Sequence, residues 1–112
     1  MNHRPLRVAS LIQMELNKLI QREVELPLGT LATITVVEVD KKMEHAKVRV
    51  SILPSSNADK ALQILHIAQG NLQHELMKKM NIKPLPRIQF VLDQGYAEAA
   101  KVEKLLIESE DK

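Results

Sequence analysis

The strict alternation of residues 46–52, AKVRVSI, constrains the fold more than any other stretch of this chain. Every second residue is apolar, and these four would point to one side: Ala46, Val48, Val50 and Ile52. The residues between them, Lys47, Arg49 and Ser51, would point to the other side. Such a strand has one buried and one wet face, which is typical of an antiparallel sheet covered on one side only. The rest of the chain must therefore supply partner strands and a cover for the apolar face.

Two further segments have the composition of strands. Residues 31–39, LATITVVEV, are rich in β-branched side chains, and the adjacent Val36 and Val37 predict either a bulge or burial on both faces. The polar run DKKMEH joins this segment to the alternating strand as a turn. Residues 87–92, RIQFVL, predict a third strand whose core side is Ile88, Phe90 and Leu92.

Three segments show the 3.6-residue periodicity of amphipathic helices: 6–23, 58–80 and 95–107. The first has its apolar stripe at Val8, Leu11, Ile12, Leu16, Leu19 and Ile20, with Gln13, Asn17, Lys18 and Gln21 opposite. The last has Ala99, Val102, Leu105 and Leu106 on its stripe. The sequence therefore predicts one α+β domain over 1–112, in which helices cover one face of three strands. Its core spans about 6–93, a C-terminal helix spans about 95–107, and the core is aliphatic because the chain has one Phe, one Tyr and no Trp.

A glycine inside the second helical segment needs an explanation, because glycine in mid-helix costs roughly 1 kcal/mol relative to alanine. The apolar positions 61, 65, 68, 72, 76 and 80 stay in phase across Gly70, which predicts a bend with a shared buried face. In one interpretation Gly70 ends a helix in the left-handed conformation and Asn71 caps the next helix. In the other, a kink exposes backbone N–H groups that could bind an anion.

Charge is distributed unevenly along the chain. Residues 1–92 hold thirteen basic and eight acidic residues, a net charge of +5, whereas residues 93–112 have a net charge of −3. This asymmetry indicates a polyanionic partner, or else only a solvated surface. With so few aromatic rings, contacts to a nucleic acid would rely on phosphate and shape. Ten basic residues are the candidates: Arg4, Arg7, Lys41, Lys42, Lys47, Arg49, Lys78, Lys79, Lys83 and Arg87.

Signatures of enzymes are missing from the sequence. It contains no GxGxxG, no GxxxxGK[ST] and no HExxH motif, and it has no cysteine. The four histidines are scattered, and the pair His66 and His74 is interpreted as ordinary surface side chains, not metal ligands. We therefore expect no enzymatic activity, no cofactor, no metal and no small-molecule substrate. With no signal peptide and no apolar run of membrane-spanning length, we expect a cytoplasmic protein that does not contact membranes.

The order of elements, with a kink between two helices, resembles a type II KH domain. Four stretches are similar to bacterial ribosome-binding factor A and together cover about 4–107: RPLRVASLIQMEL, VEVDKKMEHAKVRVSIL, IAQGNLQHEL and KMNIKPLPRIQFVLD. The resemblance implies that Ala68, Gln69 and Gly70 form the interhelical kink that replaces the GxxG loop of ordinary KH domains. It also implies a monomer that binds the free 30S subunit and its 16S rRNA, assists late maturation including processing of the rRNA 5′ end, and matters in the cold.

The resemblance carries over onto seven of the ten basic candidates: Arg4, Arg7, Lys47, Lys78, Lys79, Lys83 and Arg87. This chain departs from the family pattern at ELPLG, which lacks an arginine, at Asn81, and at Arg87, where relatives are often acidic. Two other functions stay open at this point. One is a general single-stranded RNA-binding KH module, and the other is a protein-interaction module that uses the exposed strand face.

Overall fold

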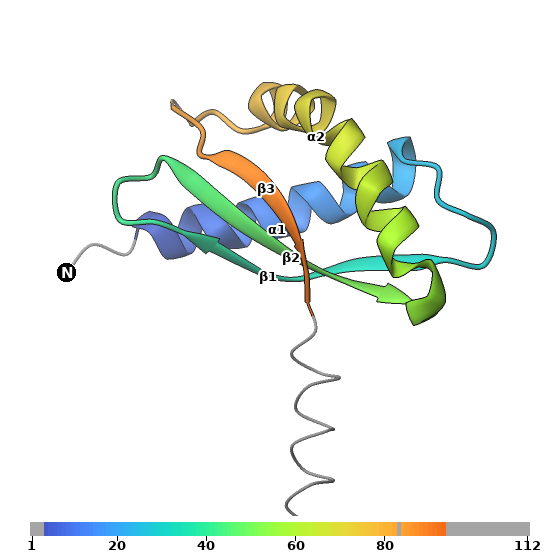
Figure 1. The fold of residues 1–112 in the computed structure, drawn as a ribbon. Coiled ribbons are helices and arrows are strands. Elements are labelled where there is room, and N and C mark those ends of the chain that lie inside the picture. The colour runs from blue at the N-terminus through green and yellow to red at the C-terminus, as the bar shows by residue number, and fades with distance from the viewer. Residues whose placement is uncertain (1–3, 83, 94–112) are drawn as a thin grey trace, which may run out of the picture.

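The computed structural model describes residues 4–82 and 84–93 (Figure 1). Its elements follow the predicted order: α1 (Arg4–Glu23), β1 (Leu31–Val39), β2 (His45–Leu53), the 3₁₀ turn η1 (Ser55–Asn57), α2 (Ala58–Lys79) and β3 (Arg87–Leu92). The α+β fold class is confirmed. The first helix starts two residues before the predicted boundary, with Pro5 in its first turn, where a missing N–H costs no helical hydrogen bond. The predicted helix over 95–107 lies outside the described residues.

The sheet has the strand order β1-β2-β3. Strands β1 and β2 pair antiparallel, as predicted, and β3 lies parallel to β2 with Val48 opposite Phe90. The register of β1 shifts between Ile34 and Val36, so the bulge is the correct interpretation of the adjacent valines. Val37 is buried and Val36 is 44% exposed, which rules out burial on both faces.

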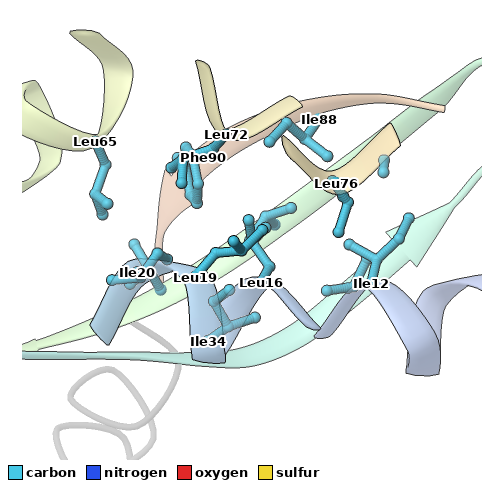
Figure 2. Close-up of a cluster of buried hydrophobic side chains, with 14 of the residues drawn as sticks. Ile12, Leu16, Leu19, Ile20, Ile34, Leu65, Leu72, Leu76, Ile88 and Phe90 are labelled. Carbon is cyan, nitrogen blue, oxygen red and sulfur yellow. The ribbon is translucent and has the colours of Figure 1, made fainter. Parts of the chain in front are cut away.

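One hydrophobic core joins the covered face of the sheet to the two described helices. Figure 2 shows side chains of α1, α2 and the strands meeting there, with Phe90 as the only aromatic ring among the buried residues of the described chain. The core is aliphatic, as expected. Two residues of the predicted apolar stripes are less buried than predicted. Leu11, at the edge of the buried face of α1, is 42% exposed, and Leu92 is only half-buried. The opposite face of the sheet, which we call the open face, carries Lys47, Arg49 and Ser51 in the middle strand.

Helix α2 is a single helix from Ala58 to Lys79, with no break at Gly70. Figure 1 shows that its axis changes direction partway along, so the expected bend occurs inside a continuous helix. The backbone of Gly70 is not left-handed, so the interpretation of Gly70 as a helix end with Asn71 as the next cap is wrong. For the same reason there is no helix N-terminus at this point to bind an anion. The in-phase stripe is confirmed by the burial of Ala61, Leu65, Leu72, Leu76 and Met80.

Candidate nucleic-acid interface

The N-terminus of α1 lies at the end of the sheet where β1 turns into β2. Helix α1 runs antiparallel to β1, because Gln13 contacts the carbonyl of Thr35 while the later Asn17 contacts Ile34. Extending this order backwards places the start of α1, which carries Arg4 and Arg7, toward the C-terminal end of β1, and Figure 1 shows the start of the helix at that end of the sheet. Both side chains are exposed, and so are those of Lys41 and Lys42 in the turn at this end of the sheet.

The C-terminus of α2 lies at the same end of the sheet. Helix α2 runs antiparallel to β3. His66, early in the helix, bonds to Phe90 late in the strand, whereas the later Gln73 bonds to Pro86 and Ile88 at the start of the strand. The first residue of β3, Arg87, donates its N–H to the carbonyl of Glu44 at 2.9 Å, which ties it to the β1–β2 turn. We call the exposed basic residues gathered here the basic end: Arg4, Arg7, Lys41, Lys42, Lys78, Lys79 and Arg87.

The β1–β2 turn is held by one carboxylate. Asp40 Oδ1 accepts the N–H of Glu44 at 2.8 Å and that of His45 at 3.3 Å, and Oδ2 lies 3.0 Å from Nδ1 of His45. The hydrogen bond to His45 is the main reason that the pKa of Asp40 lies below its ordinary value. Met43 has φ 61°, a left-handed conformation that is uncommon outside glycine and that closes the turn. The turn thereby fixes the backbone that displays Lys41 and Lys42 to solvent.

The two lysines at the end of α2 each lie near a carboxylate. Lys78 Nζ is 3.6 Å from Glu75, and Lys79 Nζ is 4.0 Å from Glu15 of α1. Ion pairs of this length near the surface contribute little to stability, because water competes for both partners. Both ammonium groups can therefore exchange the carboxylate for a phosphate at small cost.

Lys47 and Arg49 lie apart from the basic end, on the open face. Arg49 Nε donates to Glu38 at 2.6 Å, and this carboxylate raises the pKa of the guanidinium. Lys47 is the register partner of Glu38 on the neighbouring strand. The charge of both residues is thus opposed locally by Glu38. The remaining candidate, Lys83, lies outside the described residues.

The three residues of the predicted kink have separate surroundings. Ala68 is half-buried against the core, and Gln69 Oε1 accepts the N–H of Phe90 at 3.3 Å. Gly70 is exposed, and a Cβ added there would meet nothing within 4 Å. At the kink, Gln69 therefore bonds to the sheet and the backbone of Gly70 is accessible, but none of the three residues is charged.

Side chains that close the β3 edge form a feature that the sequence analysis missed. His66, Gln69 and Gln73 lie on one side of α2 at spacings of three and four, and all three bond to the backbone of the segment 86–90. The signal was present as a polar row at helical spacing beside the apolar stripe. His66 Nε2, 2.9 Å from the carbonyl of Phe90, thus has a structural partner, contrary to its interpretation as an ordinary surface side chain.

A hollow of about 310 Å³ opens between α2 and β3, close to the basic end. Its lining is polar apart from Ile88: His45, His66, Gln69, Arg87, Ile88 and Gln89. Within residues 4–82 and 84–93, no three His, Cys, Asp or Glu side chains are grouped as a metal ion would need. Over the same ranges, no helix is both long enough and apolar enough to cross a membrane.

Comparisons with known proteins identify relatives of the whole domain. A family model described as ribosome-binding factor A matches residues 4–106. A ribosome-binding factor A from Pseudomonas fluorescens Pf-5 is 34% identical over 103 residues, which span 89% of this chain and 77% of that protein. The protein of the same name from Pseudomonas aeruginosa PAO1 is 35% identical over 103 residues, spanning 89% of this chain and 80% of that protein.

Structures of ribosome-binding factor A from another bacterium share the fold. The crystal structure of ribosome-binding factor A from Thermus thermophilus matches with a TM-score of 0.69 and 23% identity, over 79% of this chain and 94% of that one. A homology model of the Thermus thermophilus factor, fitted into the cryo-EM map of a 30S complex, matches with a TM-score of 0.66 and 23% identity, over 77% and 91% of the two chains.

Proposed function

The chain belongs to the ribosome-binding factor A family, and on this premise we propose that it binds the free 30S ribosomal subunit through its basic end. The observation that carries the proposal is the convergence of basic side chains from four separate segments: the start of α1, the β1–β2 turn, the end of α2 and the start of β3. A relative from Thermus thermophilus has been placed in the map of a 30S complex, which agrees with this assignment.

The ligand within the subunit is 16S rRNA, contacted mainly at its phosphates. Lysine and arginine engage phosphates without reading base sequence, and such contacts position a protein on folded RNA. Phe90 is the single Phe, Tyr or Trp among the described residues, and it is buried in the core, so base stacking on these large rings does not contribute there. Recognition then depends on how the RNA arranges its phosphates around the basic end.

The mechanism is a shift of population among rRNA conformations. A protein favours whichever RNA fold it binds more tightly, by the difference in binding free energy between the folds. Binding of a near-mature arrangement would assist late maturation, including processing of the 16S rRNA 5′ end. The benefit is greatest in the cold, where wrongly paired RNA helices rearrange slowly. In this proposal the protein acts in the cytoplasm as a monomer, by binding alone, with no catalytic step and no cofactor.

Co-sedimentation with purified ribosomal particles tests the proposal. The protein is centrifuged with free small subunits, large subunits and joined ribosomes, at low and at moderate salt. We expect binding to free small subunits only, with affinity falling by about tenfold or more between the two salts, because phosphate contacts release counterions. Equal binding to a short single-stranded oligonucleotide would instead indicate a general RNA-binding module.

A pair of charge-reversal variants locates the binding surface. Lys78→Glu with Lys79→Glu changes the net charge by −4 at the basic end, and Lys18→Glu with Lys60→Glu makes the same change at two exposed lysines elsewhere on the helices. We expect the first variant to lose about tenfold or more of its affinity for small subunits and the second to lose far less. Equal losses in both variants would show that only net charge matters and would contradict the basic end as the interface.

A further inference from the structure

A pair of exposed leucines marks the open face at the opposite end of the sheet. Leu31, the first residue of β1, is the register partner of Leu53, the last residue of β2. They are 57% and 60% exposed, although leucine is a strongly apolar side chain. Val36, farther along β1, and the half-buried Val91 of β3 extend the apolar surface on the same face. This surface lacks a cover among residues 4–82 and 84–93.

The chain leaves the sheet next to this surface. Asp93 follows the last residue of β3, and its N–H donates to the carbonyl of Val50 at 2.7 Å, so it still lies alongside β2. Its carboxylate accepts a hydrogen bond from Thr35 Oγ1 of β1 at 2.5 Å. Because β1 and β3 are separated by β2, this bond reaches over the middle strand on the open face. The side chain of the last described residue therefore reaches across that face to β1.

The residues that follow carry an apolar stripe that needs a partner. Within 95–107 the stripe is Ala99, Val102, Leu105 and Leu106, with Lys104 opposite. A helix of this length is marginal alone in water, so it requires packing against another surface. The family model extends to residue 106, which makes this segment part of the shared domain.

From these observations we propose that residues 95–107 fold back as a helix over the open face and cover Leu31 and Leu53. A thirteen-residue helix is about 20 Å long, and the strands of the sheet are about 5 Å apart, so the helix can span all three strands. The few residues after Asp93 are long enough to make the turn, since extended chain advances about 3.3 Å per residue. The domain then becomes three layers, with the α1 and α2 layer on one face of the sheet and this helix on the other.

Hydrogen exchange of the full chain tests the packing. We expect the amides of 95–107 to exchange at least tenfold more slowly than in a peptide of the same sequence. Leu53→Lys should abolish this protection, because it places a charge under the helix while leaving the exposed position of residue 53 compatible with the fold. Ile67→Lys is the matched control, since Ile67 is 79% exposed on the outer side of α2, and it should retain the protection. Unprotected amides in the unaltered chain would overturn the proposal, and so would protection that survives Leu53→Lys.

Disulfide trapping identifies which face of the helix makes the contact, and the chain contains no cysteine that would interfere. We expect Leu53→Cys with Leu105→Cys to oxidise within one chain at least tenfold faster than Leu53→Cys with Lys104→Cys. The two pairs have nearly the same reach but differ in helical face. Equal rates would mean that residues 95–107 do not pack against the sheet through one defined face. Disulfides between chains would mean that a second copy covers the leucines. Either result would overturn the proposal.

Discussion

At the β3 edge, three polar side chains of α2 form hydrogen bonds with four successive backbone groups. At the β1 edge, by contrast, two polar side chains of α1 form hydrogen bonds with the backbone around a single bulge. Gln73 bridges the Pro86 carbonyl at 3.0 Å and the Ile88 N–H at 2.8 Å, while Gln69 and His66 take the N–H and carbonyl of Phe90. These side chains bond to outward-facing backbone groups along the β3 edge, in the position where a fourth strand would pair.

At the β1 edge, the side chains of α1 form hydrogen bonds with a shorter stretch of the strand. Asn17 Oδ1 accepts the N–H of Ile34 at 3.0 Å, and Gln13 Nε2 lies 3.3 Å from the carbonyl of Thr35. Both contacts fall at the irregularity in the register between Ile34 and Val36. Here the amides stabilise a local bulge, and the buried apolar side chains of α1 add hydrophobic contacts in the core.

The two edges differ in the length over which a helix follows a strand. Strands twist, so a straight helix stays in reach of a strand edge for only a short distance. Figure 1 shows a bend in α2 and none of comparable size in α1. Gly70 lies between Gln69 and Gln73, and we infer that the bend near it keeps both glutamines on the same strand. The kink thus supports the β3 edge, which borders the hollow and the basic end.

The largest expected effect comes from replacing Gly70 by proline. Proline removes the N–H that α2 uses for its hydrogen bond at this position and clashes with the preceding turn, at a cost of ~3 kcal/mol or more. We expect the free energy of unfolding in urea to fall by at least that amount. We also expect faster exchange of the Phe90 amide, because Gln69 is displaced from the strand. An unchanged melting temperature would show that the helix does not need to be continuous here.

Removing the amide that bridges two groups of β3 should have the next largest effect. Gln73→Leu keeps the side-chain size but leaves the Ile88 N–H and the Pro86 carbonyl without this partner, which we expect to cost about 2 kcal/mol. The open edge should also make the variant more prone to self-association, measurable by light scattering. The control is Gln63→Leu, the same change at an exposed position of α2. Equal stability of the two variants would contradict the proposed role of the edge contacts.

Removing an amide at the β1 edge should lower the free energy of unfolding by a smaller amount. Asn17→Leu removes the acceptor of the Ile34 N–H at the bulge, and we expect a loss of about 1 kcal/mol in urea denaturation. Asn71→Leu provides the comparison, because it makes the same substitution at an exposed helical position. A larger loss for Asn17→Leu than for Gln73→Leu would reverse the ranking of the two edges.

Much of this architecture was predictable from the sequence, because apolar periodicity reports which residues face the core. The alternation of residues 46–52 predicted burial correctly, and so did the stripe across Gly70 except at Ala68, which is half-buried. The edge contacts were not predictable, because Gln69 and Gln73 form hydrogen bonds to a strand that is distant in sequence. A polar side chain beside an apolar stripe has the same pattern whether it meets water or a strand edge. Likewise, charge alone grouped Arg49 with the other basic residues, and only the folded sheet, in which Arg49 lies diagonally across from Glu38, reveals their ion pair.

The smallest effect is expected for Gly70→Ala, and its sign decides what the glycine does. A Cβ at this exposed position meets nothing within 4 Å, and the backbone is not left-handed, so no steric reason for glycine is visible in the folded chain. Helix propensity alone then predicts a gain of roughly 0.5–1 kcal/mol in the free energy of unfolding. Such a gain, with unchanged affinity for small subunits, would mean that the core contacts impose the bend and glycine only permits it. A gain in stability combined with weaker binding would mean that a ligand uses the bare backbone at Gly70. A loss of stability would show that the bend itself requires glycine, and the contrast between the two edges would then trace back to this one residue.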